Sequence, residues 1–200
     1  MRDADVRSAM RRHLADAHAG DASTLIVEEM GLWSGSVRID IAVINGELAG
    51  FELKSDRDTL NRLPFQAEIY SRVFDRVDLV VGHRHFREAE KIIPNWWGIR
   101  RAATTPAGLE LEQVRESCPN PAQDSFLLAQ LLWKAEALAV LERHDLAKGC
   151  RGKRVKDIHL QLADSLTRDV LGQEVRGALK RRDGWLRQAR PNTLDVPVYA

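Results

Sequence analysis

The Asn45-Gly46 pair is the feature that most restricts the fold of this chain. It joins SVRIDIAVI, residues 36–44, to ELAGFELKS, residues 47–55, and both segments are rich in β-branched and other apolar residues. Asn-Gly between two such segments is the strongest short-range signal for a β-hairpin. The preceding segment STLIVEEM, residues 23–30, has the same character, so the sequence predicts three consecutive strands.

The register of this hairpin decides which side chains meet. A two-residue turn puts Asp40 and Glu52 on opposite faces of the sheet. A three-residue connection over 44–46, with its glycine in the left-handed position of a bulge, pairs Asp40 with Gly50 and puts Asp40, Glu52 and Lys54 on one face. The second register is preferred because it gathers one set of apolar residues on the opposite face. These are Val37, Ile39, Ile41, Val43, Phe51 and Leu53.

The three charged residues gathered by this register indicate a chemistry. Two carboxylates on neighbouring strands are not both ionised at close range unless a cation lies between them. Oxygen ligands in small number, with space for water, suit Mg²⁺ or Mn²⁺ bound together with a substrate phosphate. A lysine beside such a metal can orient or deprotonate the attacking water and neutralise charge on the phosphoryl oxygens. Asp40, Glu52 and Lys54 therefore predict phosphodiester hydrolysis.

The remaining segments complete an α/β order. Residues 3–18 carry apolar side chains at helical spacing. A second helix is expected from about Asp58 to Phe74, interrupted or kinked near Pro64. The other expected elements are a strand at 76–82, a helix at 86–93, edge strands at 96–103 and 108–114, and helices at 125–143, 154–166 and 168–182.

Asp40 and Glu52-x-Lys54 on an α-β-β-β-α-β scaffold resemble the PD-(D/E)xK phosphodiesterase superfamily, the fold of many restriction endonucleases, recombination nucleases and junction resolvases. The segment QAEIY, residues 66–70, is similar to the Q-x-x-x-Y element of the RecB-like branch. The likeness covers roughly residues 4–103 and extends to a family of uncharacterised bacterial proteins of that superfamily. It implies a restriction-endonuclease-like α/β core with a mixed sheet, followed here by a small C-terminal helical region.

The resemblance also implies roles for single residues. Asp40 and Glu52 correspond to ligands of Mg²⁺ or Mn²⁺, and Lys54 corresponds to the catalytic lysine. Gln66 and Tyr70 complete the expected catalytic set as residues that line the site toward DNA.

Two departures from the family pattern bear on this site. Ile39 stands where the motif has its proline. The first helix lacks the glutamate that the family commonly supplies, so Glu29 or Glu28 on the first strand is the expected third metal ligand, and the sequence does not choose between them.

Simpler interpretations of several residues stay open. Glu52 and Lys54 can form a structural ion pair, and Arg38, which faces Glu52 in the preferred register, is an alternative partner for that carboxylate. His83 and His85 lie two positions apart after a strand. Without a third ligand in view they are expected at the surface rather than on a metal.

Aromatic and thiol groups add little to the prediction. Trp96 and Trp97 offer rings for stacking on bases, but one is expected in the core and the other at its rim. Cys118 and Cys150 lie far apart without a partner cysteine at metal-ligand spacing, so no role is expected for either.

Charge is distributed unevenly along the chain. Residues 1–124 carry 16 Lys and Arg against 20 Asp and Glu, whereas residues 125–194 carry 14 against 8. Such asymmetry is typical of a basic appendage facing a polyanion, although a solvated helical cap or a homodimerisation element explains it equally well. In the first interpretation the expected nucleic-acid contacts of the appendage are Lys148, Arg151, Lys153, Arg154 and Lys156. Arg38 on the second strand is a further expected contact.

Composition further suggests how the chain is divided. ESCPNPAQD, residues 116–124, has the composition of a linker. We therefore expect a nuclease-like domain at 1–115, a basic helical region at 125–190 and a tail at 191–200. No apolar run approaches the roughly 20 residues that a membrane span requires, so a cytoplasmic protein without membrane contact is expected.

Two hypotheses on function follow. The first is a Mg²⁺-dependent deoxyribonuclease acting in repair, recombination or defence against foreign DNA. The second is a catalytically silent nucleic-acid-binding or interaction module that retains the nuclease fold. Divalent metal separates them, because the first alone requires Asp40 and Glu52 to bind one.

Overall fold

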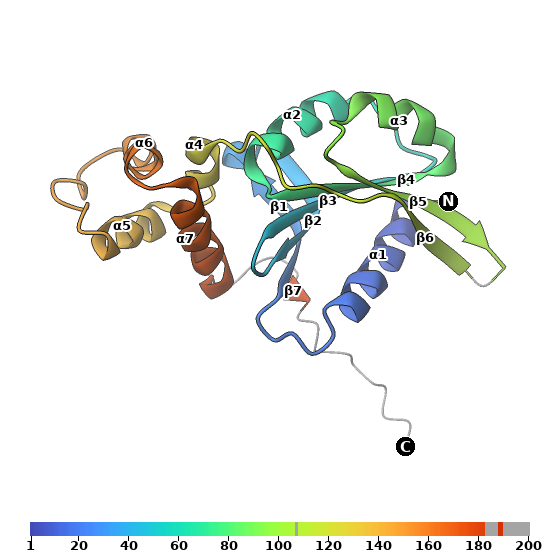
Figure 1. Ribbon diagram of the computed structural model, residues 1–200, viewed down its shortest axis with the longest axis horizontal. Coiled ribbons are helices and arrows are strands. Elements are labelled where there is room, and N and C mark those ends of the chain that lie inside the picture. Colours follow the sequence, from blue (N-terminus) through green and yellow to red (C-terminus); the bar gives the residue numbers. More distant parts are fainter. Residues whose placement is uncertain (107, 183–187, 190–200) are drawn as a thin grey trace, which may run out of the picture.

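A computed structural model of the 200-residue chain describes residues 1–106, 108–182 and 188–189. Its elements in chain order are α1 (Asp3–Ala17), β1 (Leu25–Leu32), η1 (Trp33–Gly35), β2 (Val37–Ile44), β3 (Leu48–Lys54), α2 (Leu63–Val73), β4 (Arg76–Gly82), η2 (His83–His85), α3 (Phe86–Ile92), β5 (Gly98–Thr105), β6 (Gly108–Arg115), α4 (Ser125–Ala129), α5 (Lys134–Arg143), α6 (Val155–Ser165), α7 (Arg168–Arg181) and β7 (Gln188–Ala189). Figure 1 shows their arrangement.

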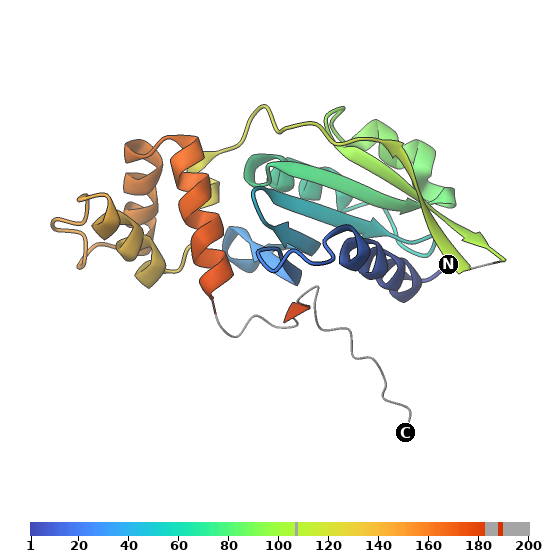
Figure 2. The same cartoon turned by 60° about the horizontal axis from the view of Figure 1, so that its bottom comes forward.

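The strands form one mixed sheet in the order β6-β5-β4-β3-β2-β1-β7. Strands β3, β4 and β5 are parallel neighbours, whereas the remaining pairs are antiparallel. Helix α1 covers one face of the sheet and α2 and α3 cover the other, while α4 to α7 gather beyond one end (Figures 1 and 2). The predicted α/β class with a mixed sheet and C-terminal helices is confirmed.

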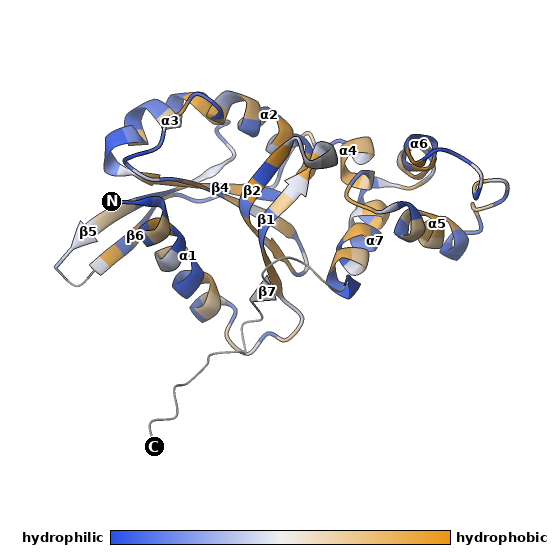
Figure 3. Cartoon of the chain, turned by 180° about the vertical axis from the view of Figure 1, so that it is seen from behind, coloured by the Kyte–Doolittle hydropathy of each residue, from blue (hydrophilic) through white to orange (hydrophobic). Residues whose placement is uncertain are grey.

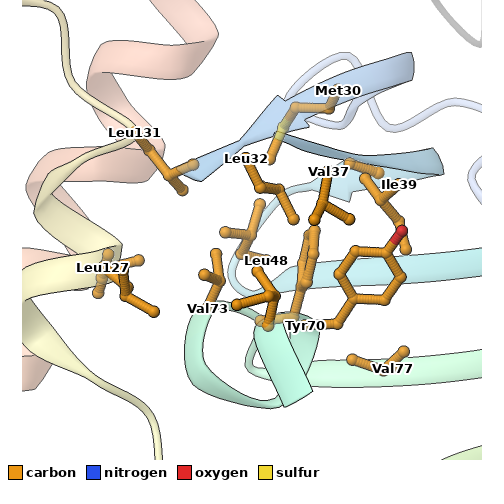
Figure 4. Close-up of a cluster of buried hydrophobic side chains, with 14 of the residues drawn as sticks. Met30, Leu32, Val37, Ile39, Leu48, Tyr70, Val73, Val77, Leu127 and Leu131 are labelled. Carbon is orange, nitrogen blue, oxygen red and sulfur yellow. The ribbon is translucent and has the colours of Figure 1, made fainter. Parts of the chain in front are cut away.

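Two hydrophobic clusters hold these layers together. The smaller cluster packs Val6, Met10 and Leu14 of α1 against the sheet. The larger one joins the opposite face of the sheet to the C-terminal helices, and Figure 4 shows Leu127 and Leu131 on its helical side. In Figure 3 the central strands are mostly apolar, whereas the surrounding helices mix apolar and hydrophilic residues. The helical region therefore shares a core with the sheet, and the predicted division into domains stays a prediction.

The hairpin differs in detail from its predicted register. Ile44 pairs with Leu48, so residues 45–47 form the connection and the strands are shifted by two residues from the prediction. The Asn45 side chain accepts the Glu47 N–H at 2.9 Å and closes this turn. Gly46 is not among the residues with positive φ, so the predicted left-handed glycine is wrong. A shift of two residues by itself leaves the alternation of side chains between the two faces unchanged.

The predicted apolar face is correct for only part of β2. Ile41 belongs to the cluster under α1, whereas Val37 and Ile39 belong to the cluster on the α2 side. On β1, Glu29 lies between the pairs made with Ile41 and Ile39, and its φ is +53°. A left-handed residue interrupts the alternation of side chains along a strand. Both strands therefore change sides here, next to Asp40.

Two predicted helices have different bounds in the structure. Helix α2 begins at Leu63 instead of Asp58, because Pro64 is tolerated in the first turn, where its missing N–H is not needed. The helix expected at 125–143 is divided into α4 and α5, and Trp133 precedes the first residue of α5.

Two strands also differ from expectation. β5 is not an edge strand, because it lies between β4 and β6. β7 falls within the region predicted to be helical and pairs with β1 at Ile26 and Val27. The predicted tail at 191–200 lies outside the described residues. Within the described ranges, no helix is long and apolar enough to cross a membrane.

Candidate active site

A polar pocket of about 580 Å³ opens where β1, β2, β3 and the starts of α1 and α2 meet. Its walls include Arg7, Glu29, Asp40, Glu52, Lys54 and Gln66. The structure thus brings together four of the five residues of the predicted catalytic set, which come from β2, β3 and α2. The fifth, Tyr70, lies behind the wall in contact with Glu52 and Gln66.

Glu52 is held from three sides. Its side chain is almost fully buried, and one carboxylate oxygen contacts Lys54 Nζ and accepts a 2.6 Å hydrogen bond from Gln66 Nε2. The other oxygen lies 2.9 Å from the Tyr70 hydroxyl, which also lies 2.6 Å from the carbonyl oxygen of Arg38. Gln66 and Tyr70 are one helical turn apart on α2, which explains how a Q-x-x-x-Y spacing fixes one carboxylate.

Asp40 is bound through both of its carboxylate oxygens. Oδ2 accepts the backbone N–H of Leu53 at 2.8 Å, just beyond the end of the β2–β3 ladder, where Ile41 pairs with Phe51. Oδ1 accepts a 2.8 Å hydrogen bond from Arg7 Nη2. Burial raises the pKa of Asp40 above its ordinary value, although the Leu53 N–H and Arg7 oppose this effect.

Arg7 is the site residue that sequence reasoning missed. Its guanidinium lies 2.8 Å from Asp40 Oδ1, 3.0 Å from Glu29 Oε1 and 3.7 Å from Glu28 Oε2. Burial lowers the pKa of Arg7, but the charge and hydrogen bond of Asp40 outweigh this and raise it. One feature of the sequence could have indicated Arg7. Arg7 and Arg11 lie one helical turn apart, beside the buried residues of α1.

The structure separates the two candidates for a third metal ligand. Glu28 is buried and bound by Arg11 at 2.6 Å, and it does not line the pocket. Glu29 lines the pocket but is bound by Arg7. In the part of the chain that the structure describes, no three or more His, Cys, Asp or Glu side chains form a group that could hold a metal. Glu29 as a ligand stays a prediction.

The donor set at Asp40 and Glu52 nevertheless fits a hard divalent cation. Mg²⁺ is commonly held by one or two carboxylates, with waters and substrate phosphate completing its shell. Gln66 Oε1 is a further oxygen, buried in the pocket wall without a hydrogen-bond partner among the described residues. Asp40 and Glu52 would hold Mg²⁺ or Mn²⁺, with Arg7 as the cation that neutralises Asp40 in the metal-free chain.

Glu52 should make stability depend on pH. Burial, followed by the charge of Asp40, raises the pKa of Glu52 from 4.5 to about 7. The folded chain then holds this proton more tightly than the unfolded chain, so the contribution is complete below pH 4.5 and is lost as pH rises through 7.

We expect the free energy of unfolding, measured by urea denaturation in EDTA, to fall as the pH rises from 4.5 through 7. The fall should be larger in the wild type than in Glu52→Gln, by at most about 3 kcal/mol. Parallel pH profiles for the two proteins would contradict this assignment of the proton to Glu52.

The predicted nucleic-acid contacts are dispersed. Arg38 has a side chain that is 66% exposed, and its nearest acid is Glu29 at 3.7 Å. It does not pair with Glu52, so the alternative in which Arg38 neutralises that carboxylate is wrong. The other five are exposed in or next to the loop between α5 and α6, at the end of the molecule away from β5 and β6 (Figures 1 and 2). They are Lys148, Arg151, Lys153, Arg154 and Lys156.

The remaining candidates have structural surroundings. Trp97 is fully buried in the core and Trp96 packs against it edge-on, as expected for a core and a rim ring. His83 is exposed in η2 and His85 is half-buried. Neither belongs to a metal-holding group in the described ranges.

Comparison with known proteins gives the chain a family. A protein of unknown function from Silicibacter pomeroyi, SPO1766, shares 21% identity and a TM-score of 0.46, with 77% of this chain and 96% of that chain covered. Protein cII of Enterobacteria phage P4 is 26% identical over 121 residues, or 60% of this chain. The chain spans about half, 46%, of that relative's length. The family model for bacteriophage P4 protein cII matches residues 1–192, and the chain therefore belongs to the bacteriophage P4 protein cII family.

Proposed function

We propose that the chain is a divalent-metal-dependent nuclease that hydrolyses phosphodiester bonds of DNA in repair, recombination or defence against foreign DNA. The observation that supports this most is the convergence of Asp40, Glu52 and Lys54 on one polar pocket. The antiparallel β1-β2-β3 meander, followed by α2 and a parallel β4, is compatible with a restriction-endonuclease-like core.

Each residue of the predicted catalytic set has a task in this proposal. A divalent ion, when bound, would polarise the scissile phosphate and acidify a water molecule. Lys54 brings a positive charge to Nζ, where it stabilises charge that develops on the phosphoryl oxygens and holds a proton near the attacking water. Gln66 and Tyr70 fix the carboxylate of Glu52, and the Leu53 N–H fixes that of Asp40. Such fixed groups lose little free energy to reorganisation during the reaction.

A second candidate function has its own support. In the metal-free chain Arg7 pairs with Asp40 and Lys54 pairs with Glu52, so each of these carboxylates has a cationic partner without a metal. This arrangement favours a catalytically silent module that binds nucleic acid and retains the fold.

Divalent metal separates the two functions. The wild-type chain is incubated with labelled linear, circular, single-stranded and branched DNA, in Mg²⁺ or in EDTA, and Mg²⁺ binding is titrated by calorimetry. A nuclease binds the ion and cleaves at least one substrate in Mg²⁺ alone. Absence of both ion binding and cleavage, with DNA present, assigns the chain to the silent module.

The basic loop gives a prediction about affinity. Lys148 and Lys156 are exposed and make no ion pair with another described residue. If they contact phosphates, the double variant Lys148→Gln/Lys156→Gln should bind DNA more weakly in EDTA. Its slope of log affinity against log salt should also be shallower by about 1 for each lost contact. Lys91→Gln on α3 is the control.

Point variants are needed because deletion of the helices would expose the core residues Leu127 and Leu128. An unchanged salt slope would assign this loop to packing or to dimerisation.

A further inference from the structure

An exposed pair of aromatic rings stands out among the surface side chains. Trp33 is 42% exposed and Phe65 is 45% exposed, and their ring centroids lie 6.0 Å apart. The other exposed large apolar residues of the described chain are Val114, Trp133, Val155 and Leu160. The two ring planes are tilted by 43°, so the pair presents exposed apolar ring faces to solvent instead of burying them in the core.

This pair lies at the mouth of the candidate active site. Phe65 itself lines the pocket and precedes Gln66, which holds Glu52. Gly35 of the η1 turn, which Trp33 begins, lines the same pocket. A group seated on the two rings would therefore be adjacent to the carboxylates and Lys54.

The backbone holds both rings in place from separate elements. Trp33 has a φ of +46°, a left-handed conformation that is rare for a bulky residue and is set by the turn between β1 and β2. Phe65 follows Pro64 in the first turn of α2. The ring pair is consequently built from two segments that are separated in sequence and meet beside the pocket.

The charged side chains of the same pocket indicate which class of ligand the two rings suit. Arg38 and Arg62 line the same pocket, the Arg38 side chain is 66% exposed, and Arg62 is exposed without an ion pair to another residue in the described ranges. Exposed aromatic rings and guanidinium groups around one pocket suit a ligand that has both flat rings and phosphates. Single-stranded nucleic acid has this chemistry, because its bases are free to stack on side chains. The bases of an intact duplex are stacked on one another.

We propose that Trp33 and Phe65 form a stacking platform for an unpaired base next to the phosphate that enters the pocket. The substrate class is then single-stranded DNA, or an unpaired end or flap of a duplex. This inference rests on the proposed function, because only a nuclease has DNA as its substrate. Binding of DNA by the platform, in contrast, requires no metal.

The test measures binding in EDTA, where no metal-dependent cleavage occurs. A labelled oligothymidine, an abasic oligonucleotide of the same length and a blunt duplex are titrated with the wild type, Phe65→Leu, Trp33→Leu and the ring-conserving Phe65→Trp. Loss of one base–aromatic stack should weaken oligothymidine binding by roughly 5- to 150-fold in the leucine variants. Phe65→Trp should bind like the wild type, and duplex and abasic affinities should stay unchanged in all variants.

Trp133→Leu is the matched control, because Trp133 is 60% exposed but does not line the pocket. The proposal is overturned if the wild type binds the abasic strand as tightly as oligothymidine, if Phe65→Leu binds like the wild type, or if Trp133→Leu loses as much affinity. It is also overturned if Phe65→Leu converts a dimer to a monomer without changing DNA affinity. Thermal melting identifies any variant that does not fold, and Phe65, exposed in the first turn of a helix, is the safer of the two sites.

These outcomes are separable from failure of the proposed function. If the leucine variants lose affinity for oligothymidine but the wild type cleaves no DNA in Mg²⁺, the chain is a single-strand-binding module and not a nuclease. If the wild type cleaves DNA in Mg²⁺ and both leucine variants bind DNA as tightly as the wild type, the proposed nuclease function is retained and the stacking platform is rejected.

Discussion

Lys54→Ala is expected to lower the rate of DNA cleavage by about 10²- to 10⁴-fold, the usual effect of removing one catalytic group. Lys54 is buried in the pocket wall and contacts Glu52, and its removal takes away no carboxylate. Binding of Mg²⁺ should therefore be largely retained. Single-turnover cleavage and calorimetric titration of Mg²⁺ measure the two properties separately.

The structure adds a condition to this experiment. The pKa of Glu52 is raised to about 7 even beside Lys54, and loss of the lysine charge raises it further. A protonated Glu52 is a poor metal ligand, so both measurements should be made well above pH 7 as well as at neutral pH. Lys91→Ala on the surface is the control. Cleavage by Lys54→Ala at the wild-type rate under both conditions would show that this lysine takes no part in the chemistry.

Asp40→Asn is expected to abolish both Mg²⁺ binding and cleavage, because it removes one of two charged ligands while nearly keeping the side-chain shape. It should also destabilise the metal-free chain. The carboxylate accepts hydrogen bonds from Leu53 N–H and Arg7, whereas an amide has one acceptor oxygen and must direct its NH₂ group at one of these donors. Because a buried donor loses its partner, we expect a loss of about 1–3 kcal/mol by urea denaturation in EDTA.

Arg7→Ala is the informative partner variant. It removes the guanidinium that competes with a metal at Asp40 but leaves both carboxylates in place. We expect its Mg²⁺ affinity to equal or exceed that of the wild type, and its stability to rise more steeply with added Mg²⁺. If Asp40→Asn binds Mg²⁺ as the wild type does, Asp40 is not a ligand. If Arg7→Ala loses Mg²⁺ binding while remaining folded, Arg7 is more than a counter-ion.

Local patterns in the sequence were sufficient for much of the fold. Asn45-Gly46 between two apolar segments predicts the hairpin, and the spacing of Gln66 and Tyr70 predicts that both reach the same side of a helix. The register was wrong by two residues, yet Asp40 and Glu52 still line one pocket. The reason is that side chains alternate with period two, so an even shift leaves their faces unchanged.

Sequence periodicity could not determine where the strands change sides. Ile39 and Ile41 alternate as a single apolar face, but they belong to separate clusters because the backbone of the neighbouring strand is left-handed at Glu29. Non-glycine residues adopt that conformation when tertiary packing imposes it. Nothing in the local pattern of apolar residues reports it.

The sequence by itself determined most of the strands and helices and the residue types of the candidate site, since these depend on propensity and on repeats of two and 3.6 residues. Only the tertiary structure placed Arg7 of α1 on Asp40, 33 positions away, and set Trp33 against Phe65 at the pocket mouth. It also joined the C-terminal helices to the core of the sheet. Contacts between distant segments depend on how whole elements pack, and this packing has no signature in any short stretch of sequence.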